Sequence, residues 1–308
     1  MSAYGPLLDA LRGVRWPARR AVGNAPPGAH RSTQKGTAGE FTEYRLYRQG
    51  DDPRALDWRL LARSDRAFVR LSDDRALLST WIVVDASASM AFPEEAAARS
   101  KFAQARLVAV GLAAIAHASS DPVGLLVVHA QGMQRVPPRT RRGTVQELAR
   151  VLDGVGPGGS APLAPLVAQL PVHARVVLLT DCLGDADALL RTVAAHTVAG
   201  AQVECVHVVA DAELALPSGT FLVHDPEQPR DERVLSAAGR AAYRERFDNF
   251  RRDMRTRWRA AGAGYTEVRT GDDAARAARA VVMGTALSGA GQPTEGPKPP
   301  APSSSVGR

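Results

Sequence analysis

Cysteine is nearly absent from this 308-residue chain, which has only Cys182 and Cys205. Two cysteines are too few for a disulfide framework, and their spacing is not that of a metal site. We therefore expect both to pack as small apolar groups in a reducing compartment. Long apolar runs are missing too. The longest, at 107–118, is too short to span a bilayer, and the N-terminus has no signal-peptide core. The sequence predicts a cytoplasmic protein.

Aromatic residues are also scarce, at 5% of the chain, which argues against a surface that stacks nucleic-acid bases. The 39 basic residues outnumber the 32 acidic ones, and the formal charge of +7 suits an anionic partner. Arginine is scattered along the whole chain beside carboxylates, however, so the charge alone does not identify that partner.

From 77 to 287, short β-rich runs alternate with helical stretches, which predicts an α/β domain with a doubly wound, mostly parallel sheet. A short strand at 133–137 is expected to pair antiparallel at the sheet edge, because Pro137 removes a ladder hydrogen bond. The other strands are apolar runs, and the first three are apolar throughout, which is typical of strands covered on both faces. These runs are 79–85, 123–129, 174–180, 202–209 and 264–268.

Helical periodicity fills the intervals between these strands. The expected helices are 96–118, 143–153, 162–170, 185–198, 236–261 and 272–284. The helix at 236–261 places Phe247, Met254 and Trp258 on one face and a row of arginines on another. We interpret it as a packed surface helix with a solvated basic side. The alternative is a nucleic-acid-binding helix, whose binding would weaken steeply with salt.

The chain on either side of the sheet domain has a different character. Residues 1–38 are predicted to form a basic amphipathic helix and a Gly/Pro-rich linker, and such a helix can also attach to a membrane surface. Residues 39–76, dense in both charge signs, are expected to pack on the sheet domain through an arginine–carboxylate network. Within them, Asp52 is predicted to cap a helix over 53–63. Residues 288–308, rich in Pro, Ser and Gly, are expected to be disordered.

Two of the buried strands end in an aspartate, Asp85 in VVDASASM and Asp181 in VVLLTDCLGD. Ligands bind at the carboxyl ends of parallel strands, where these side chains meet. Ser87 and Ser89 follow the first aspartate, and a glycine-rich turn brings Ser160 to the same edge. Such oxygen ligands match Mg²⁺ or another divalent cation, whose open position would accept a carboxylate from another protein. Each residue alone also suits a helix cap or a turn.

Three classes of enzyme do not fit these motifs. A phosphohydrolase of the haloacid dehalogenase type needs a second acid at position 87, where this chain has serine. A serine hydrolase needs a G-x-S-x-G turn, and neither Ser87 nor Ser89 has those flanking glycines. A P-loop is absent, so any ATP hydrolysis would belong to a partner. We therefore expect a non-enzymatic protein without a small-molecule substrate.

VVDASASM, with Ser160 and Asp181, resembles the metal-ion-dependent adhesion site of von Willebrand factor type A domains. That resemblance implies the strand order 3-2-1-4-5-6, direct ligation by the two serines of the motif, and ligation through water by Asp85 and Asp181. Ser160 would replace the usual threonine, and it lacks the methyl group that stiffens the threonine rotamer. Ala161 stands where many relatives have an acid. Both departures imply weaker metal binding.

The segment EYRLYRQGDDPRALDWRLLAR (43–63), with DPE at 225–227 and RAAYRERF at 240–247, resembles the bacterial domain-of-unknown-function 58 family, whose members carry such a domain. The resemblance covers about residues 30–285 and is most specific over 39–90. Members are often encoded beside MoxR-type AAA ATPases. The resemblance therefore implies an adaptor that binds proteins through Mg²⁺ or another divalent cation, with a MoxR-type AAA ATPase and an unidentified client as partners.

Overall fold

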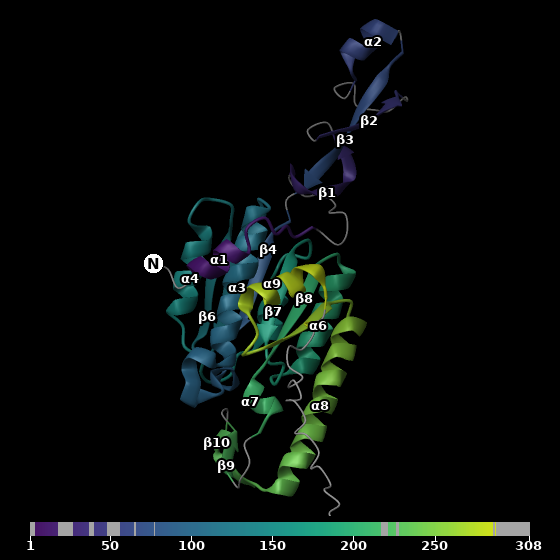
Figure 1. Cartoon of the computed structure of the whole chain (residues 1–308). Coiled ribbons are helices and arrows are strands. Elements are labelled where there is room, and N and C mark those ends of the chain that lie inside the picture. The colour runs from purple at the N-terminus through teal and green to yellow at the C-terminus, as the bar shows by residue number, and fades with distance from the viewer. Residues whose placement is uncertain are drawn as a thin grey trace, which may run out of the picture.

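The centre of the molecule is a six-stranded sheet in the order β11-β8-β7-β4-β5-β6 (Figure 1). The computed structural model describes residues 4–17, 27–36, 40–47, 56–64, 66–76, 78–216, 221–225, 228–285 and 287. The strands of this sheet are β4 (Thr80–Asp85), β5 (Val123–His129), β6 (Gly132–Arg139), β7 (Arg175–Thr180), β8 (Gln202–Val209) and β11 (Gly264–Arg269). Neighbours run parallel except for the edge pair of β5 and β6. Counted from β4, the order is 3-2-1-4-5-6, which confirms the prediction.

Helices cover both faces of this sheet. On one face lie α1 (Gly5–Ala10), α3 (Lys101–Ala118), α4 (Thr144–Asp153) and α9 (Ala274–Met283), and on the other lie α5 (Leu163–Val167), α6 (Ala186–Val198) and α8 (Ala237–Ala260). In β4, Ile82 and Val84 join the first core, whereas Trp81 and Val83 join the second. Every residue of this strand is buried, as its apolar run predicted. None of the helices in the described residues is both long and apolar enough to cross a membrane.

The long helix predicted over 96–118 begins later than expected. Residues Glu94–Arg99 form a separate 3-10 turn, η3. The helix α3 then starts at Lys101, because the Ser100 hydroxyl accepts the amide of Ala103 at 3.1 Å and caps it. This cap places Lys101 in the first turn of α3, where its side chain is buried.

The N-terminal segment 4–17 packs on the sheet domain and contributes to its core. Tyr4, Leu11 and Trp16 are buried. A side chain at Gly111 of α3 would meet Leu11 at 3.0 Å, which shows how closely the segment approaches that helix. Only Gly5–Ala10 is helical. The apolar side that a membrane-surface helix would need is therefore turned into the protein.

One buried guanidinium connects this segment to the sheet. Arg175 is 1% exposed, and it donates to the carbonyls of Trp16 and Pro17 at 3.2 and 3.3 Å. Its other nitrogen donates to the Asp121 carboxylate at 3.2 Å. The same guanidinium lies 4.3 Å from the Trp16 ring centre, within the range of a cation–π contact. Burial of Arg175 is therefore compensated by one carboxylate, two carbonyls and an aromatic face.

Two smaller sheets were not predicted. The strands β1 (Pro27–Gly36), β2 (Glu40–Leu46) and β3 (Phe68–Ala76) form an antiparallel sheet, and β9 (Phe221–Asp225) pairs with β10 (Gln228–Leu235). The expectation of a linker is wrong for Pro27–Gly36. Figure 1 shows the three-stranded sheet set apart from the central one. That residues 39–76 pack on the sheet domain stays a prediction, as do the domain boundaries.

The helix expected over 53–63 is shorter in the structure. The helix α2 spans Trp58–Ser64. Asp57, rather than Asp52, accepts the amides of Arg59 and Leu60, at 3.0 and 2.9 Å. Asp52 and the tail predicted at 288–308 lie outside the described residues.

We expect Arg175→Met to lower the free energy of unfolding by about 3–5 kcal/mol, because it removes the buried guanidinium that pairs with the Asp121 carboxylate. Urea denaturation followed by circular dichroism measures the change. The control is Arg279→Met, because the exposed guanidinium of Arg279 also donates to segment 4–17, at the Ala10 carbonyl. That variant should change stability by no more than about 0.5 kcal/mol. Equal losses in both variants would contradict a special role for the buried pair.

Candidate metal centre

Three connections meet at the carboxyl end of β4 and β7. Asp85 is the last residue of β4, and the loop after it leads into the 3-10 turn η2 (Ala88–Ala91). The glycine-rich turn docks on this loop through two backbone hydrogen bonds, from Gly158 N to Ala86 O at 2.9 Å and from Ala88 N to Gly159 O at 2.7 Å. These bonds bring Ser160 to the same edge.

Glycine is required at position 159 of that turn. Gly159 has φ +61°, and a Cβ atom there would lie 2.3 Å from the Cβ of Ala130. A side chain would therefore be strained by its backbone and would collide with its neighbour. Gly159 thus fixes the approach of Ser160 to the loop after β4.

Asp85 is a buried carboxylate with two hydrogen-bond donors. Its Oδ1 accepts the amide of Ser87 at 2.9 Å, and its Oδ2 accepts the hydroxyl of Thr180 at 2.7 Å. Burial, together with the nearby charge of Asp181, raises the pKa of Asp85 from 3.8 to about 6. These two donors do not offset the loss of hydration, so a cation bound here would stabilise the ionised form.

The hydroxyls of Ser87 and Ser89 lie 3.1 Å apart, and both residues are buried. Neighbouring ligands of an octahedral Mg²⁺ ion, each at about 2.1 Å from it, lie about 3.0 Å from one another. The two hydroxyls therefore have the separation of adjacent magnesium ligands. Together with the Asp85 carboxylate they form the all-oxygen donor set that a hard cation prefers.

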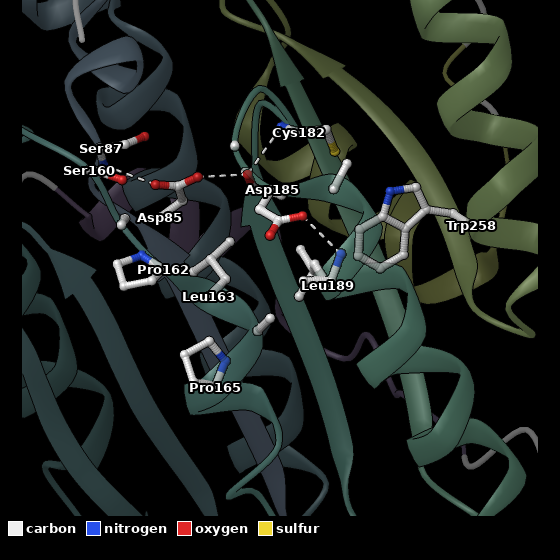
Figure 2. A pocket seen from close by; sticks show the side chains of 16 residues that line it. Asp85, Ser87, Ser160, Pro162, Leu163, Pro165, Cys182, Asp185, Leu189 and Trp258 are labelled. Atoms are coloured by element: carbon white, nitrogen blue, oxygen red, sulfur yellow. Dashed lines mark hydrogen bonds between the residues drawn. The ribbon is translucent and has the colours of Figure 1, made fainter.

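Figure 2 shows Asp85, Ser87 and Ser160 close together at one side of a pocket. The pocket has a volume of about 180 Å³, which exceeds the roughly 150 Å³ of a cavity that binds benzene. Its remaining walls are mostly apolar and come from α5, α6, α8 and the loops before α5 and α6. They include Pro162, Leu163, Ala164, Pro165, Cys182, Ala186, Leu189 and Trp258. A cation here would thus sit beside a space for one leucine-sized side chain.

Two of the five predicted ligands, Ser89 and Asp181, do not line the pocket. Ser89 still lies beside Ser87, whereas Asp181 Oδ1 accepts the amide of Leu183 at 3.1 Å. Its Oδ2 accepts the ammonium of Lys101 at 2.7 Å, and Lys101 also donates to Glu213 Oε1 at 3.0 Å. Asp181 is near enough to raise the pKa of Asp85. Its carboxylate nevertheless already has a positive partner.

Sequence reasoning missed Thr180, Lys101 and Glu213. Thr180 directly precedes Asp181, so its position on the same strand end was available. Lys101 carried a compositional signal, because only three of the 39 basic residues are lysine, the others being Lys35 and Lys298. Glu213, in α7 (Asp211–Leu214), is 112 residues from Lys101, and nothing local in the sequence connects the two.

A doubly wound sheet in the order 3-2-1-4-5-6, with a D-x-S-x-S motif at the end of its first strand, defines a von Willebrand factor type A-like fold. The family model described as "Protein of unknown function DUF58" matches residues 43–257. The chain therefore belongs to the DUF58 family.

Among curated proteins, the chain is similar to the uncharacterized protein Rv1480 of Mycobacterium tuberculosis (strain ATCC 25618 / H37Rv) and to Mb1516 of Mycobacterium bovis (strain ATCC BAA-935 / AF2122/97). Each is 28% identical over 231 residues, which cover 72% of this chain and 71% of the relative. Among solved structures, the chain is similar to BatB from Bacteroides thetaiotaomicron, with 15% identity and a TM-score of 0.43. The match covers 67% of this chain and 96% of the BatB chain. The SpRpn10 VWA domain has 11% identity and a TM-score of 0.39, with coverages of 66% and 94%.

In metal-free protein, Asp85 binds its proton more tightly in the folded state, because its pKa is raised there to about 6. The stability that this provides is complete below pH about 4 and is lost as the pH rises through about 6. Asp85→Asn is neutral throughout. In EDTA at pH 7.5 we therefore expect it to be more stable than wild type by about 1–3 kcal/mol in urea denaturation.

The same variant should lose the stabilisation by Mg²⁺ that we expect of wild type. Asp185→Asn is the matched control, because Asp185 lines the same pocket and caps α6 through Ala188 N at 2.9 Å, a role that asparagine also performs. It should retain the response to Mg²⁺. An Asp85→Asn variant that is less stable than wild type at pH 7.5 would contradict the electrostatic cost assigned to this carboxylate.

Proposed function

We propose that the protein is a non-enzymatic cytoplasmic adaptor that binds other proteins through a divalent cation, Mg²⁺ in the simplest case. The observation that carries this proposal is the meeting of Asp85, Ser87 and Ser160 at one pocket, with the Ser89 hydroxyl 3.1 Å from that of Ser87. A cation bound to these oxygens would supply an electron-poor coordination position. The von Willebrand factor A-like fold supports a protein-interaction role.

The pocket beside the donor set indicates the chemistry of the bound protein. A carboxylate from that protein would reach the cation, and an apolar side chain next to it would enter the space between Leu163, Leu189 and Trp258. Burial of a leucine-sized group stabilises a complex by about 1.5–3 kcal/mol. The cation would therefore select the acidic residue, and the pocket would select its neighbour.

The contacts of α8 favour this proposal over nucleic-acid binding. Arg251 pairs with Glu267, and Arg257 pairs with Asp187. The opposite face of the helix is packed, with Met254 buried in the second core. Carboxylates thus neutralise part of the basic side, because Arg251 and Arg257 already have acidic partners within the domain.

The resemblance to the family implies the partner, a MoxR-type AAA ATPase that would act with this chain on a client protein. The chain has no P-loop, so the energy of ATP would come from that ATPase. The adaptor would bind a client, or the ATPase itself, through the cation at the carboxyl edge of the sheet. Its role would be chaperone-like or in assembly.

The test is co-purification of the MoxR-type ATPase encoded in the same genome with tagged wild type, Asp85→Ala and Asp185→Asn. We expect wild type and Asp185→Asn to retain the ATPase in 5 mM MgCl₂, a routine excess for a site of this kind. EDTA and Asp85→Ala should each abolish retention, whereas ~0.5 M NaCl should weaken it only mildly.

Retention that survives both EDTA and Asp85→Ala would contradict the metal joint. A steep loss with salt, unchanged by EDTA, would instead indicate binding through charge alone. Circular dichroism of each variant shows whether lost binding reflects lost folding.

Ala164→Phe tests the apolar pocket separately from the metal. Ala164 is half-buried in the pocket wall, so a phenylalanine there should fill the space and weaken partner binding roughly 10- to 100-fold. Metal binding, measured by calorimetry, should not change. The control is Ala168→Phe, one turn further along and exposed, which should bind like wild type. Equal affinities for both variants would contradict a role for the pocket.

A further inference from the structure

A buried ammonium lies next to the Asp181 carboxylate. Lys101 is 1% exposed, and its Nζ lies 2.7 Å from Asp181 Oδ2 and 3.0 Å from Glu213 Oε1. It also lies 6.0 Å from the centre of the Phe92 ring. Two carboxylates within ion-pair distance compensate the burial of this ammonium. The lysine is therefore charged, and it is held by two acids from different strand ends.

Glu213 is itself fixed. Its second oxygen accepts the amide of Ala210 at 2.7 Å, at the start of α7. The carboxylate thus bridges the end of β8 to the ammonium of Lys101 at the start of α3. Asp181 completes its own contacts with the amide of Leu183. Neither carboxylate has to move for Lys101 to remain bound.

This arrangement determines the charge that a metal ion would encounter. Asp85 faces the pocket and has only neutral donors, from Ser87 and Thr180. Asp181 does not line the pocket, and it shares the ammonium of Lys101 with Glu213. The one ammonium lowers the summed charge of Asp85, Asp181 and Glu213 from about −3 to about −2. A divalent cation at the rim would therefore be attracted less strongly than by the three carboxylates alone.

We propose that Lys101 is the residue that sets the strength of the metal site, by holding Asp181 and keeping the affinity for a divalent cation low until a partner supplies its own carboxylate. This rests on the proposed function. A site without this ammonium would bind its cation more tightly and leave it less attractive to an acidic partner. With the lysine in place, tight binding of the cation depends on the carboxylate of the partner, so metal and partner bind cooperatively.

The identity of the residue supports this role. Elsewhere the fold uses arginine for a deeply buried cation, as at Arg175, where the planar group spans several acceptors. At position 101 the chain has one of its three lysines. An ammonium is a compact point charge that fits between two single carboxylate oxygens and presents no further donors to the pocket.

The test is Lys101→Met, which keeps the length of the side chain and removes its charge. Mn²⁺ is the probe, because both calorimetry and the electron paramagnetic resonance of the free ion report its binding without a partner. At pH 7.5 we expect the dissociation constant for Mn²⁺ to fall at least about tenfold relative to wild type. In EDTA, the melting temperature of Lys101→Met should be below that of wild type. On adding Mn²⁺, it should rise by more than the melting temperature of wild type does.

Glu213→Gln is the matched variant with the opposite expectation. Losing this acid leaves Lys101 paired with Asp181 alone, so Mn²⁺ should bind more weakly than to wild type. A purely structural lysine would make both variants less stable and would shift Mn²⁺ affinity in the same direction. Should Lys101→Met fail to fold, Glu213→Gln decides: weaker binding supports the proposal, and equal or tighter binding overturns it.

The outcomes separate this inference from the proposed function. Wild type that binds Mn²⁺, with Lys101→Met binding equally or more weakly, overturns the role of Lys101 and leaves the proposed function standing. If Lys101→Met binds Mn²⁺ and wild type does not, the role of Lys101 is supported. That result would overturn the idea that wild type holds a cation before the partner binds. If neither wild type nor folded Lys101→Met binds Mn²⁺, both the role of Lys101 and the proposed function are overturned.

Discussion

A carboxylate that is buried at the end of an apolar strand needs a positive partner or a proton, and this requirement organises the carboxyl edge of the sheet. For Asp181 the positive partner is the ammonium of Lys101, a residue of the same chain. Asp85 has only neutral donors, from Ser87 and Thr180, and burial together with the charge of Asp181 raises its pKa. The two aspartates have equivalent places in the fold but different partners. That difference separates an internal charge pair from an open binding position.

Much of this architecture follows from the pattern of apolar residues. Strands that are buried on both faces must be apolar throughout, so β4, β5 and β7 were predicted correctly, and the prolines of β6 placed it at an edge. The D-x-S-x-S loop follows from the same rule, because polar residues directly after a buried strand have to lie at its end. These features depend on a few consecutive residues, which is why one sequence suffices to predict them.

The remaining features depend on residues that are distant in the sequence. The three-stranded sheet β1-β3-β2 lies in a segment dense in charge, where alternation of apolar and polar residues is weak, and it was missed. Lys101 and Glu213 meet only because α3 begins, and α7 lies, near the ends of β7 and β8. The role of Asp57 as the cap of α2 is local, but Asp52 before a proline was an equally good candidate by composition. Pairing over long distances, rather than propensity, is what a single sequence does not determine.

The N-terminal segment 4–17 has a consequence for how the chain folds during its synthesis. It is made before α9, yet it packs on that helix, and its backbone carbonyls accept hydrogen bonds from Arg175 and Arg279, which are made much later. Domains generally fold as units while the ribosome extends the chain. Here the first core cannot be completed until α9 has emerged, so Tyr4, Leu11 and Trp16 lack part of their packing partners while most of the domain is being synthesised, when aggregation competes with folding.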